Sequence, residues 1–243
     1  MNDQFQRTRM LIGQENLDKL AAAKVLVFGV GGVGGYVCEA LCRGGVGLID
    51  IVDKDVVDVT NINRQIIATH GTVGRPKVEA CRERMLSINP DVKVDARQCF
   101  YLPERAGEFD FGAYDYVVDA VDNVTAKIDI ICNARAAGVP VISSMGTGNK
   151  LDPTMFKIAD IEKTKVCPLA KVVRKELRKR GVFGVKVLYS EEEPRKPLLR
   201  WRNGEPLTDN VDEAKRTPAS ISFVPSAAGL IIAGRVILDI LEM

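Results

Sequence analysis

The sequence contains few residues that favour metal or disulfide chemistry. Its 243 residues include one histidine, His70, and six cysteines, none of which form a Cys-x-x-Cys pair. Structural zinc sites usually rely on such pairs, so we expect no zinc. The cysteines are scattered along the chain and do not resemble a disulfide framework, which favours a reducing, cytoplasmic location. We expect His70, in a loop before Gly71, to be incidental.

The chain also lacks an excess of charge and a long uninterrupted apolar run. Lys and Arg number 34 and Asp and Glu 32, so contact with nucleic acid would need a local basic patch. Residues 1–9 are polar and charged, unlike a secretory signal. Pro218 and Pro225 interrupt the uncharged stretch 217–234. The helical part that remains is shorter than a span of about 20 residues, so we expect a buried C-terminal helix and no stable membrane insertion, with a membrane anchor as the alternative.

A glycine-rich turn follows the first apolar run. The sequence Gly29-Val-Gly-Gly-Val-Gly34 comes directly after residues 24–28, and Asp53 lies nineteen residues beyond Gly34. In this pattern Gly29 permits a tight turn, Gly31 lets the backbone approach a phosphate, and Gly34 allows close packing of helix on strand. The helix N-terminus offers N–H groups to an anion, and Asp53 is placed to bind ribose hydroxyls. The pattern predicts a nucleotide site without separating NAD from ATP.

Strands alternate with helices over the first 150 residues. We expect strands at 25–28, 47–52, 92–99, 116–120 and 139–144, and helices at 33–43, 77–87 and 123–137, after one or two short helices within 2–22. This alternation predicts an α/β fold, a Rossmann-like, doubly wound and mainly parallel sheet. Strands at 154–161, 184–189 and 221–224 and helices at 169–180 and 226–241 predict a mixed or antiparallel C-terminal extension. The charged, proline-rich segment 190–216 predicts a mobile loop.

Two cations follow the ribose acid. Arg64 and Lys77 lie beyond Asp53, with Asn61 nearby as a polar orienting group. A hydride-transferring dehydrogenase needs no such cations. An enzyme that splits ATP between the α and β phosphates does, because negative charge grows on the α-phosphate and on the leaving pyrophosphate. The alternative is that both are surface charges on a loop.

Asp122 follows the predicted strand 116–120, where open α/β sheets bind ligands. A carboxylate there can hold Mg²⁺ together with phosphate oxygens. It can equally cap the helix that follows, and the two roles are compatible. Asp119 is ambiguous, since it can simply end the strand.

Five motifs in this order resemble the HesA/MoeB/ThiF superfamily of adenylating enzymes, which are related to ubiquitin-activating enzymes. They are Gly-x-Gly-Gly-Val-Gly, Asp-x-Asp, Thr-Asn-Ile-Asn-Arg-Gln, Gly-x-Pro-Lys and Asp-Ala-Val-Asp-Asn. The resemblance implies one adenylating domain over 1–243 that forms a homodimer, with a nucleotide-binding half (1–150) and a substrate and dimer half (151–243). It implies Arg64, Lys77 and Arg9 as catalytic residues, Arg9 reaching into the partner's site, and Asp122 as the Mg²⁺ ligand. The ATP-binding residues it implies are Gly29, Gly31, Gly32, Gly34, Asp53, Asp55, Asn61, Arg64, Gln65, Lys77, Asp122 and Asn123.

Within the superfamily, three segments are similar to the tRNA threonylcarbamoyladenosine dehydratase branch: 146–154, 167–170 and 222–229. This resemblance implies ATP-dependent cyclisation of the threonylcarbamoyl group on adenosine 37 of tRNA, through an adenylated carboxylate. That scheme needs no enzyme nucleophile, so we interpret Cys167 as structural, with a thioester role as the alternative. Alternative functions are adenylation of a ubiquitin-like sulfur carrier, whose enzymes usually carry zinc-binding cysteine pairs, and a non-catalytic nucleotide sensor.

The helix expected at 169–180 carries the basic patch that a tRNA partner would need. Leu169, Val172, Val173 and Leu177 form an apolar stripe for the core. The basic residues are candidates for phosphate contacts, although a solvated helix face explains them equally well. The candidates are Lys171, Arg174, Lys175, Arg178 and Lys179. A monovalent cation (K⁺ or Na⁺) in the site and a cysteine desulfurase or sulfur acceptor as a partner stay open.

Overall fold

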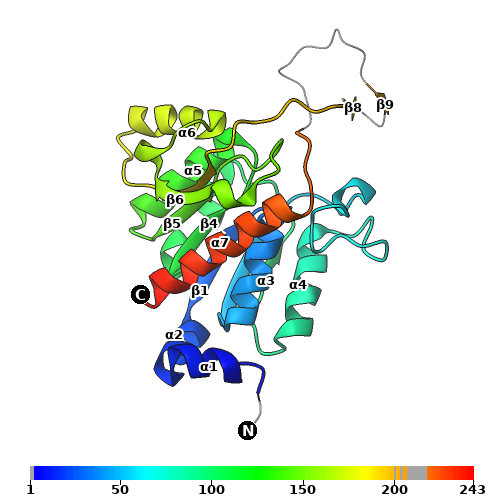
Figure 1. Ribbon diagram of the computed structural model, residues 1–243. Helices are drawn as coiled ribbons and strands as arrows, with labels where there is room; N and C mark the ends of the chain where they lie inside the picture. Colours follow the sequence, from blue (N-terminus) through cyan, green and yellow to red (C-terminus); the bar gives the residue numbers. More distant parts are fainter. Residues whose placement is uncertain (1–2, 200, 203–204, 207–217) are drawn as a thin grey trace.

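The computed structural model describes residues 3–199, 201–202, 205–206 and 218–243 (Figure 1). Its centre is a seven-stranded sheet in the order β3-β2-β1-β4-β5-β7-β6. Every neighbouring pair is parallel except β6 and β7, which are antiparallel. The strands are β1 (Lys24–Phe28), β2 (Leu48–Val52), β3 (Ala96–Arg97), β4 (Tyr116–Asp119), β5 (Val141–Ser144), β6 (Phe156–Asp160) and β7 (Lys186–Ser190). The predicted Rossmann-like sheet with a mixed C-terminal extension is confirmed.

Helices cover both faces of the sheet (Figure 1). Alternate residues of β1 serve the two sides: Val25 and Val27 pack with one group of helices, and Leu26 and Phe28 with the other. This alternation is the two-residue period of a strand buried on both faces. The first group is α3 (Gly34–Gly44), α4 (Lys77–Ile88) and α7 (Phe223–Ile240), and the second is α5 (Val124–Ala136) and α6 (Pro168–Lys179). Helices α1 (Gln6–Ile12) and α2 (Gln14–Ala22) precede β1.

Two strand predictions differ from the structure. Of the strand expected at 92–99 only Ala96–Arg97 forms, with one isolated bridge between Lys93 and Leu48. The strand expected at 221–224 is absent, because α7 begins at Phe223. Pro225 lies in the first turn of that helix, where backbone N–H groups have no intrahelical partner and proline costs little. The C-terminal helix is therefore longer than the sequence suggested.

Helix α7 lies across α3 (Figure 1). A Cβ atom on Gly229 would lie 2.4 Å from the Val33 carbonyl oxygen, so glycine permits this close crossing. Among the described helices, α7 is the one long and apolar enough to cross a membrane by length and composition alone, and 39% of that stretch is buried. The predicted burial of the C-terminal helix holds for one face, which includes Ala228, Ile232 and Val236, whereas Leu230 and Leu238 are exposed.

The remaining elements are short. The 3₁₀ helices η1 (Val59–Asn61), η2 (Pro103–Glu108), η3 (Phe111–Ala113), η4 (Pro153–Met155) and η5 (Ile161–Lys163) lie in connections. A two-stranded ladder of β8 (Trp201–Arg202) and β9 (Glu205–Pro206) lies within the expected loop 190–216. Residues 200, 203–204 and 207–216 of that loop lie outside the described part of the chain, and its mobility stays a prediction.

Candidate active site

A cleft of about 770 Å³ opens at the carboxyl ends of the strands. Residues that follow β1, β2, β4 and β5, four adjacent strands, contribute to its walls. This edge is where open α/β sheets bind ligands, and the volume is typical of a small-molecule site. The structure brings together in this cleft all the nucleotide-binding residues suggested by the sequence except Gly34.

The glycine turn has the geometry expected of a phosphate-binding loop. Gly29 adopts φ +83°, and a Cβ atom there would lie 2.8 Å from the Ala120 carbonyl oxygen. A Cβ atom on Gly34 would lie 1.8 Å from the Gly29 carbonyl oxygen, which explains why Gly34 serves packing and does not line the cleft. Above Gly31 the nearest atom to such a Cβ is Gln65 Nε2, at 3.8 Å. The backbone at Gly31 is therefore open to a ligand.

The carboxylate of Asp53 is held by the backbone around it. Its Oδ2 accepts a hydrogen bond from the Val30 N–H at 2.8 Å, and its Oδ1 accepts one from the Asp55 N–H at 2.9 Å. Burial raises the pKa of Asp53 above its ordinary value, although the two N–H donors oppose the shift. Asp53 thus joins the end of β2 to the glycine turn after β1, at the position where a ribose would contact both.

Lys77 begins α4 and reaches back to the segment after β2. Its Nζ lies 2.9 Å from Asp55 Oδ2, and its side chain is only 8% exposed. The pairing orients the ammonium at the wall of the cleft, where the charges of Asp53 and Asp58 also act on it. Such a fixed cation is suited to a phosphate group.

Arg64 and Gln65 follow the short helix η1. Asp58 and Asn61 cap η1 reciprocally, and this capping box holds Asn61 in place. Arg64 Nη1 donates to the Thr60 carbonyl at 2.9 Å, and burial lowers the pKa of this guanidinium. Gln65 is 6% exposed, and its Oε1 has no hydrogen-bond partner among the described residues. The cleft wall therefore offers a cation and an unsatisfied acceptor side by side.

Asp122 does not cap the helix that follows it, which was one of the two roles expected of it from the sequence. Asn123, not Asp122, caps α5, because its Oδ1 accepts the Ala126 N–H at 3.0 Å. The exposed Asp122 carboxylate lines the cleft beside it. Within the described ranges no three His, Cys, Asp or Glu residues cluster as a metal site. A single carboxylate still fits Mg²⁺, which commonly takes one or two carboxylates and completes its shell with phosphate oxygens and water.

A buried ion pair that no sequence motif indicated lies beneath the cleft. Lys127 Nζ lies 2.7 Å from Asp119 Oδ2 and 2.9 Å from the Ser144 carbonyl oxygen, and neither charged side chain is exposed. Ser143 Oγ also donates to Asp119. Burial raises the pKa of Asp119, opposed by Lys127 and Ser143. The available signal was a lysine placed among the apolar residues of a core helix.

A second wall of the cleft consists of the loop after β5 and the start of α6. Lys150 and Cys167 line it, with exposed fractions of 4% and 4%. Cys167 is the N-cap residue of α6, and Val166 before it adopts φ +60°, which is unusual for a β-branched residue. Sequence reasoning used this region to choose between branches but assigned no ligand contact to Lys150.

Arg9 and His70 lie outside the cleft. Arg9 belongs to α1, where its Nη2 lies 2.6 Å from Asp3 Oδ2 and its Nε donates to Gln14 Oε1 at 2.5 Å. Helix α1 is far from the carboxyl end of the sheet (Figure 1). His70 is exposed in a loop. Neither residue contributes to the cleft of its own chain.

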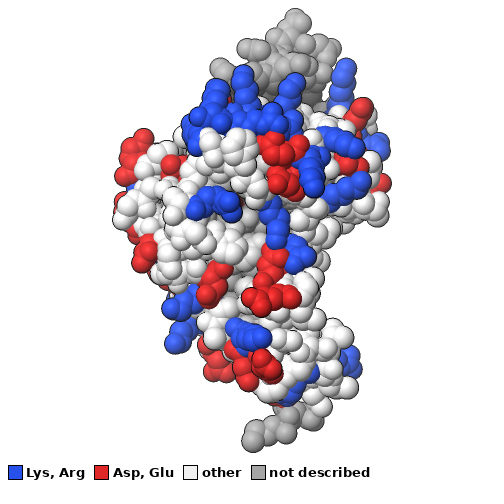
Figure 2. Space-filling view, turned by 90° about the vertical axis from the view of Figure 1, so that its left-hand side faces the viewer, with Lys and Arg blue, Asp and Glu red and all other residues white. Residues whose placement is uncertain are grey.

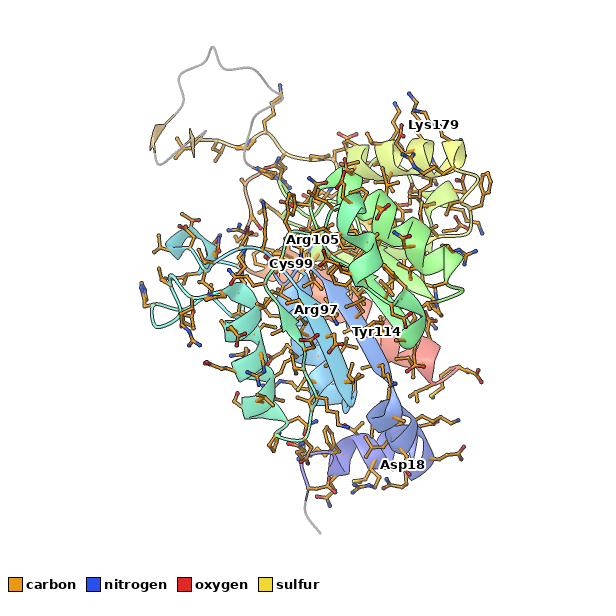
Figure 3. The ribbon with its side chains drawn as sticks, turned by 180° about the vertical axis from the view of Figure 1, so that it is seen from behind. Asp18, Arg97, Cys99, Arg105, Tyr114 and Lys179 are labelled. Atoms are coloured by element: carbon orange, nitrogen blue, oxygen red, sulfur yellow. The ribbon has the colours of Figure 1, made fainter. Side chains whose placement is uncertain are left out.

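The basic helix α6 departs in part from its predicted pattern. Its buried residues are Ala170, Val173 and Leu177, whereas Val172 is 48% exposed. The predicted apolar stripe was therefore wrong at Val172, because the core-facing row passes through Ala170. Figure 2 shows Lys and Arg side chains gathered over the end of the molecule where α6 lies. In Figure 3 Lys179 extends outward from this helix.

Several of the basic side chains on α6 are held by intramolecular contacts. Arg174 Nη1 donates to Thr164 Oγ1 at 2.6 Å and to the Ile161 carbonyl at 3.2 Å. Arg178 pairs with Glu162, and Lys179 pairs with Glu176. Lys171 and Lys175 are exposed and take no part in an ion pair within the described residues. These two lysines are the members of the patch most available to an anionic partner.

The comparisons with known proteins agree with this geometry. The model of the ThiF family matches residues 5–241. A tRNA threonylcarbamoyladenosine dehydratase from Bacillus subtilis (strain 168) is 46% identical over 100% of this chain and 96% of its own length. The enzyme of that name from Escherichia coli (strain K12) is 37% identical over 77% of this chain and 73% of its own. A crystal structure of an E. coli tRNA N6-threonylcarbamoyladenosine dehydratase in complex with ATP matches with a TM-score of 0.86 at 30% identity, covering 98% of this chain and 94% of that one.

Proposed function

The chain belongs to the ThiF family, and we propose that it is an ATP-dependent tRNA threonylcarbamoyladenosine dehydratase. One observation carries this proposal: a single cleft gathers the phosphate-binding turn, the Asp53 carboxylate and the cations Arg64 and Lys77. Relatives of that name match over the full chain, and one of them is solved with ATP. We assign the nucleotide to the half formed by residues 1–150 and the substrate to residues 151–243 together with the loop after β5 that joins the two halves.

The chemistry consists of two displacements. A carboxylate oxygen of the threonylcarbamoyl group attacks the α-phosphorus of ATP, and the bond to the β-phosphate oxygen breaks to release pyrophosphate. A nucleophile within the same modified nucleoside then attacks the activated carbonyl carbon, loses its proton and expels AMP. The oxygen lost from the substrate leaves on AMP, so the net change is the loss of one water. Ring closure is intramolecular, and positioning can therefore supply much of its rate.

Different residues of the cleft bind the ribose, bind the phosphates and stabilise the charge that develops in the reaction. Asp53 holds the ribose, and the backbone of Gly29–Gly32 approaches the phosphates. Arg64 and Lys77 meet the charge that develops on the α-phosphate and on pyrophosphate, in a partly buried setting where such contacts are strong. Asn61, Gln65 and Asn123 complete the polar lining. Asp55 orients Lys77, since their side chains pair at 2.9 Å.

Asp122 is the residue that would hold Mg²⁺. The metal would neutralise phosphate charge and orient the leaving pyrophosphate. Asp122 is exposed in the cleft and free of the capping role that Asn123 performs, which leaves its oxygens available to a metal.

Assembly of two chains would complete the site. Arg9 is absent from the cleft of its own chain, and Met10 and Leu11 beside it are 81% and 85% exposed. Helix α7 also exposes apolar side chains, among them Leu230 at 50% and Phe223 at 43%. Exposed apolar surface of this kind marks an interaction site. We propose a homodimer in the cytoplasm in which Arg9 acts in the partner's cleft.

The deciding experiment is mass spectrometry of tRNA nucleosides after incubation with the protein, ATP and Mg²⁺. The modified nucleoside should lose the mass of one water, and AMP and pyrophosphate should appear in equal amounts. A parallel incubation with a ubiquitin-like sulfur carrier tests the alternative, since a carrier–AMP adduct without tRNA turnover would contradict the proposal. Release of no pyrophosphate with either substrate would indicate a nucleotide sensor.

A further inference from the structure

Lys150 is a buried cation in the part of the cleft that the nucleotide does not explain. It follows β5, whereas Arg64 and Lys77 follow β2. The sheet order β2-β1-β4-β5 therefore separates the two sets of cations across the width of the cleft. All three side chains line the same space. The triphosphate of one ATP would account for Arg64 and Lys77, and Lys150 is then available to a second anion.

The ammonium of Lys150 forms no direct ion pair with a carboxylate of the described residues, although the charge of the nearby Glu192 carboxylate offsets part of its own. Lys150 is 4% exposed and donates a hydrogen bond to the backbone carbonyl of Glu192. The Glu192 carboxylate is used elsewhere, accepting the Leu151 N–H at 3.0 Å and the Asp152 N–H at 2.9 Å. Within the described residues Lys150 joins no ion pair. Burial lowers the pKa of Lys150, and the charge of Glu192 opposes this shift without cancelling it.

An independent feature of the same wall also favours an anion. Helix α6, twelve residues long, begins there, and Cys167, Pro168 and Leu169 all line the cleft. Cys167 makes no side-chain cap to the helix, so the first backbone N–H groups have no capping acceptor from it. The positive end of the helix dipole is directed at the same space.

We propose that Lys150, together with the start of α6, binds the carboxylate of the substrate that is to be adenylated. This inference rests on the proposed function and adds the place and chemistry of the acceptor subsite. The carboxylate would enter from the β5 side, with its oxygen facing the α-phosphate held from the β2 side. Lys150 keeps its proton throughout. The bond formed is from carboxylate oxygen to phosphorus, and the bond broken is that to pyrophosphate.

The test compares a charged with a neutral ligand. The nucleoside N6-threonylcarbamoyladenosine and its carboxamide are measured as competitive inhibitors of turnover on tRNA. The wild type should bind the carboxylate about tenfold or more tightly than the amide, as expected for a charge-assisted hydrogen bond. In Lys150→Met this preference should fall to about one, while the affinity for ATP stays within about twofold of wild type. A lysine with only a structural role would weaken both inhibitors equally.

The matched control is Lys157→Met, which removes an exposed lysine on β6 that pairs with Glu191. This variant should keep the preference for the carboxylate. If Lys150→Met does not fold, Lys150→Gln, which keeps a donor for the Glu192 carbonyl, is measured in the same way. The inference is overturned if either folded variant prefers the carboxylate over the carboxamide as strongly as the wild type does. It is also overturned if the affinity for ATP falls as much as the affinity for the carboxylate, because Lys150 would then belong to the nucleotide site. A wild-type protein that releases no pyrophosphate with modified tRNA defeats the proposed function itself and the inference with it.

Discussion

The ammonium of Lys127 lies 2.7 Å from Asp119 Oδ2, and neither side chain reaches solvent. Because Lys127 also donates to the Ser144 carbonyl, the pair joins the ends of β4 and β5, from which two cleft loops depart. Lys127→Met leaves the Asp119 charge buried alone, so the free energy of unfolding should fall by about 3–5 kcal/mol. Urea unfolding measures it. The double variant Lys127→Met/Asp119→Asn should recover part of the loss, and a single variant as stable as wild type would contradict this interpretation.

Arg64→Ala and Lys77→Ala should each lower kcat for pyrophosphate release by about 10²–10³-fold, the scale measured for other fixed groups that stabilise transition-state charge. Arg64 is half-buried, whereas Lys77 is buried and pairs with Asp55, so the melting temperature of each variant is measured first to confirm that it is folded. Arg75→Ala is the matched control: Arg75 lies two residues before Lys77, pairs with Glu83 and is not part of the cleft. Turnover that survives either change would remove that residue from the reaction.

The nucleotide half could be predicted from the sequence because its determinants are local. The glycine turn directly follows the residues of β1, and Asp53 directly follows those of β2, so short stretches of sequence carry the pattern. The contact of Gly34 with Gly29 is also local, whereas the close approach of Gly29 to Ala120 is not. The doubly wound sheet could also be predicted from the sequence, because the apolar runs of strands alternate with helices along the chain. Only Ala96–Arg97 of the strand expected at 92–99 forms, because this segment lies at the edge of the sheet and pairs with β2 alone among the described strands.

Lys127 and Lys150 could not be assigned in this way because their surroundings are assembled from distant segments. Lys150 contacts Glu192, 42 residues away, and Lys127 contacts the end of another strand. From the residue type alone, each of these lysines would be expected on the surface. The exposure of Val172 has a similar cause, since the direction from which α6 meets α5 decided which row of its residues is buried.

Arg9→Ala and Arg64→Ala should each be inactive alone, yet mixing the two should restore activity. In a mixed dimer the Arg9→Ala subunit has an intact cleft and receives Arg9 from its partner. Half of the sites in half of the dimers are then complete, so an equal mixture should reach about a quarter of wild-type activity after subunit exchange. Two cleft variants, Arg64→Ala and Lys77→Ala, serve as the control mixture and should stay inactive. Failure of rescue after proven exchange would place Arg9 outside the partner's site.

Lys171→Glu/Lys175→Glu should weaken tRNA binding without changing ATP affinity. Each lysine that contacts a phosphate releases counterions, so the slope of log affinity against log salt should decrease by about one per residue lost. Filter binding at several salt concentrations measures the slope. The control Lys19→Glu changes an exposed lysine on α2, at the other end of the molecule. A double variant with the wild-type slope would show that tRNA lies on another face.

Asp239 should give the fold a pH-dependent contribution. Burial opposes its ionisation, but hydrogen bonds from Lys186, Tyr116 and Arg235 prevail and lower its pKa below the ordinary 3.8. A carboxyl whose pKa is lower in the folded state stabilises that state above the unfolded pKa, and the contribution is lost as pH falls through the folded value. Asp239→Asn should therefore cost about 1–3 kcal/mol at pH 7, with the gap narrowing below about pH 4. Urea unfolding from pH 7 to 3 measures the gap, with exposed Asp91→Asn as control. A gap that stays constant over this range would mean that the charge of Asp239 is not what stabilises the end of α7.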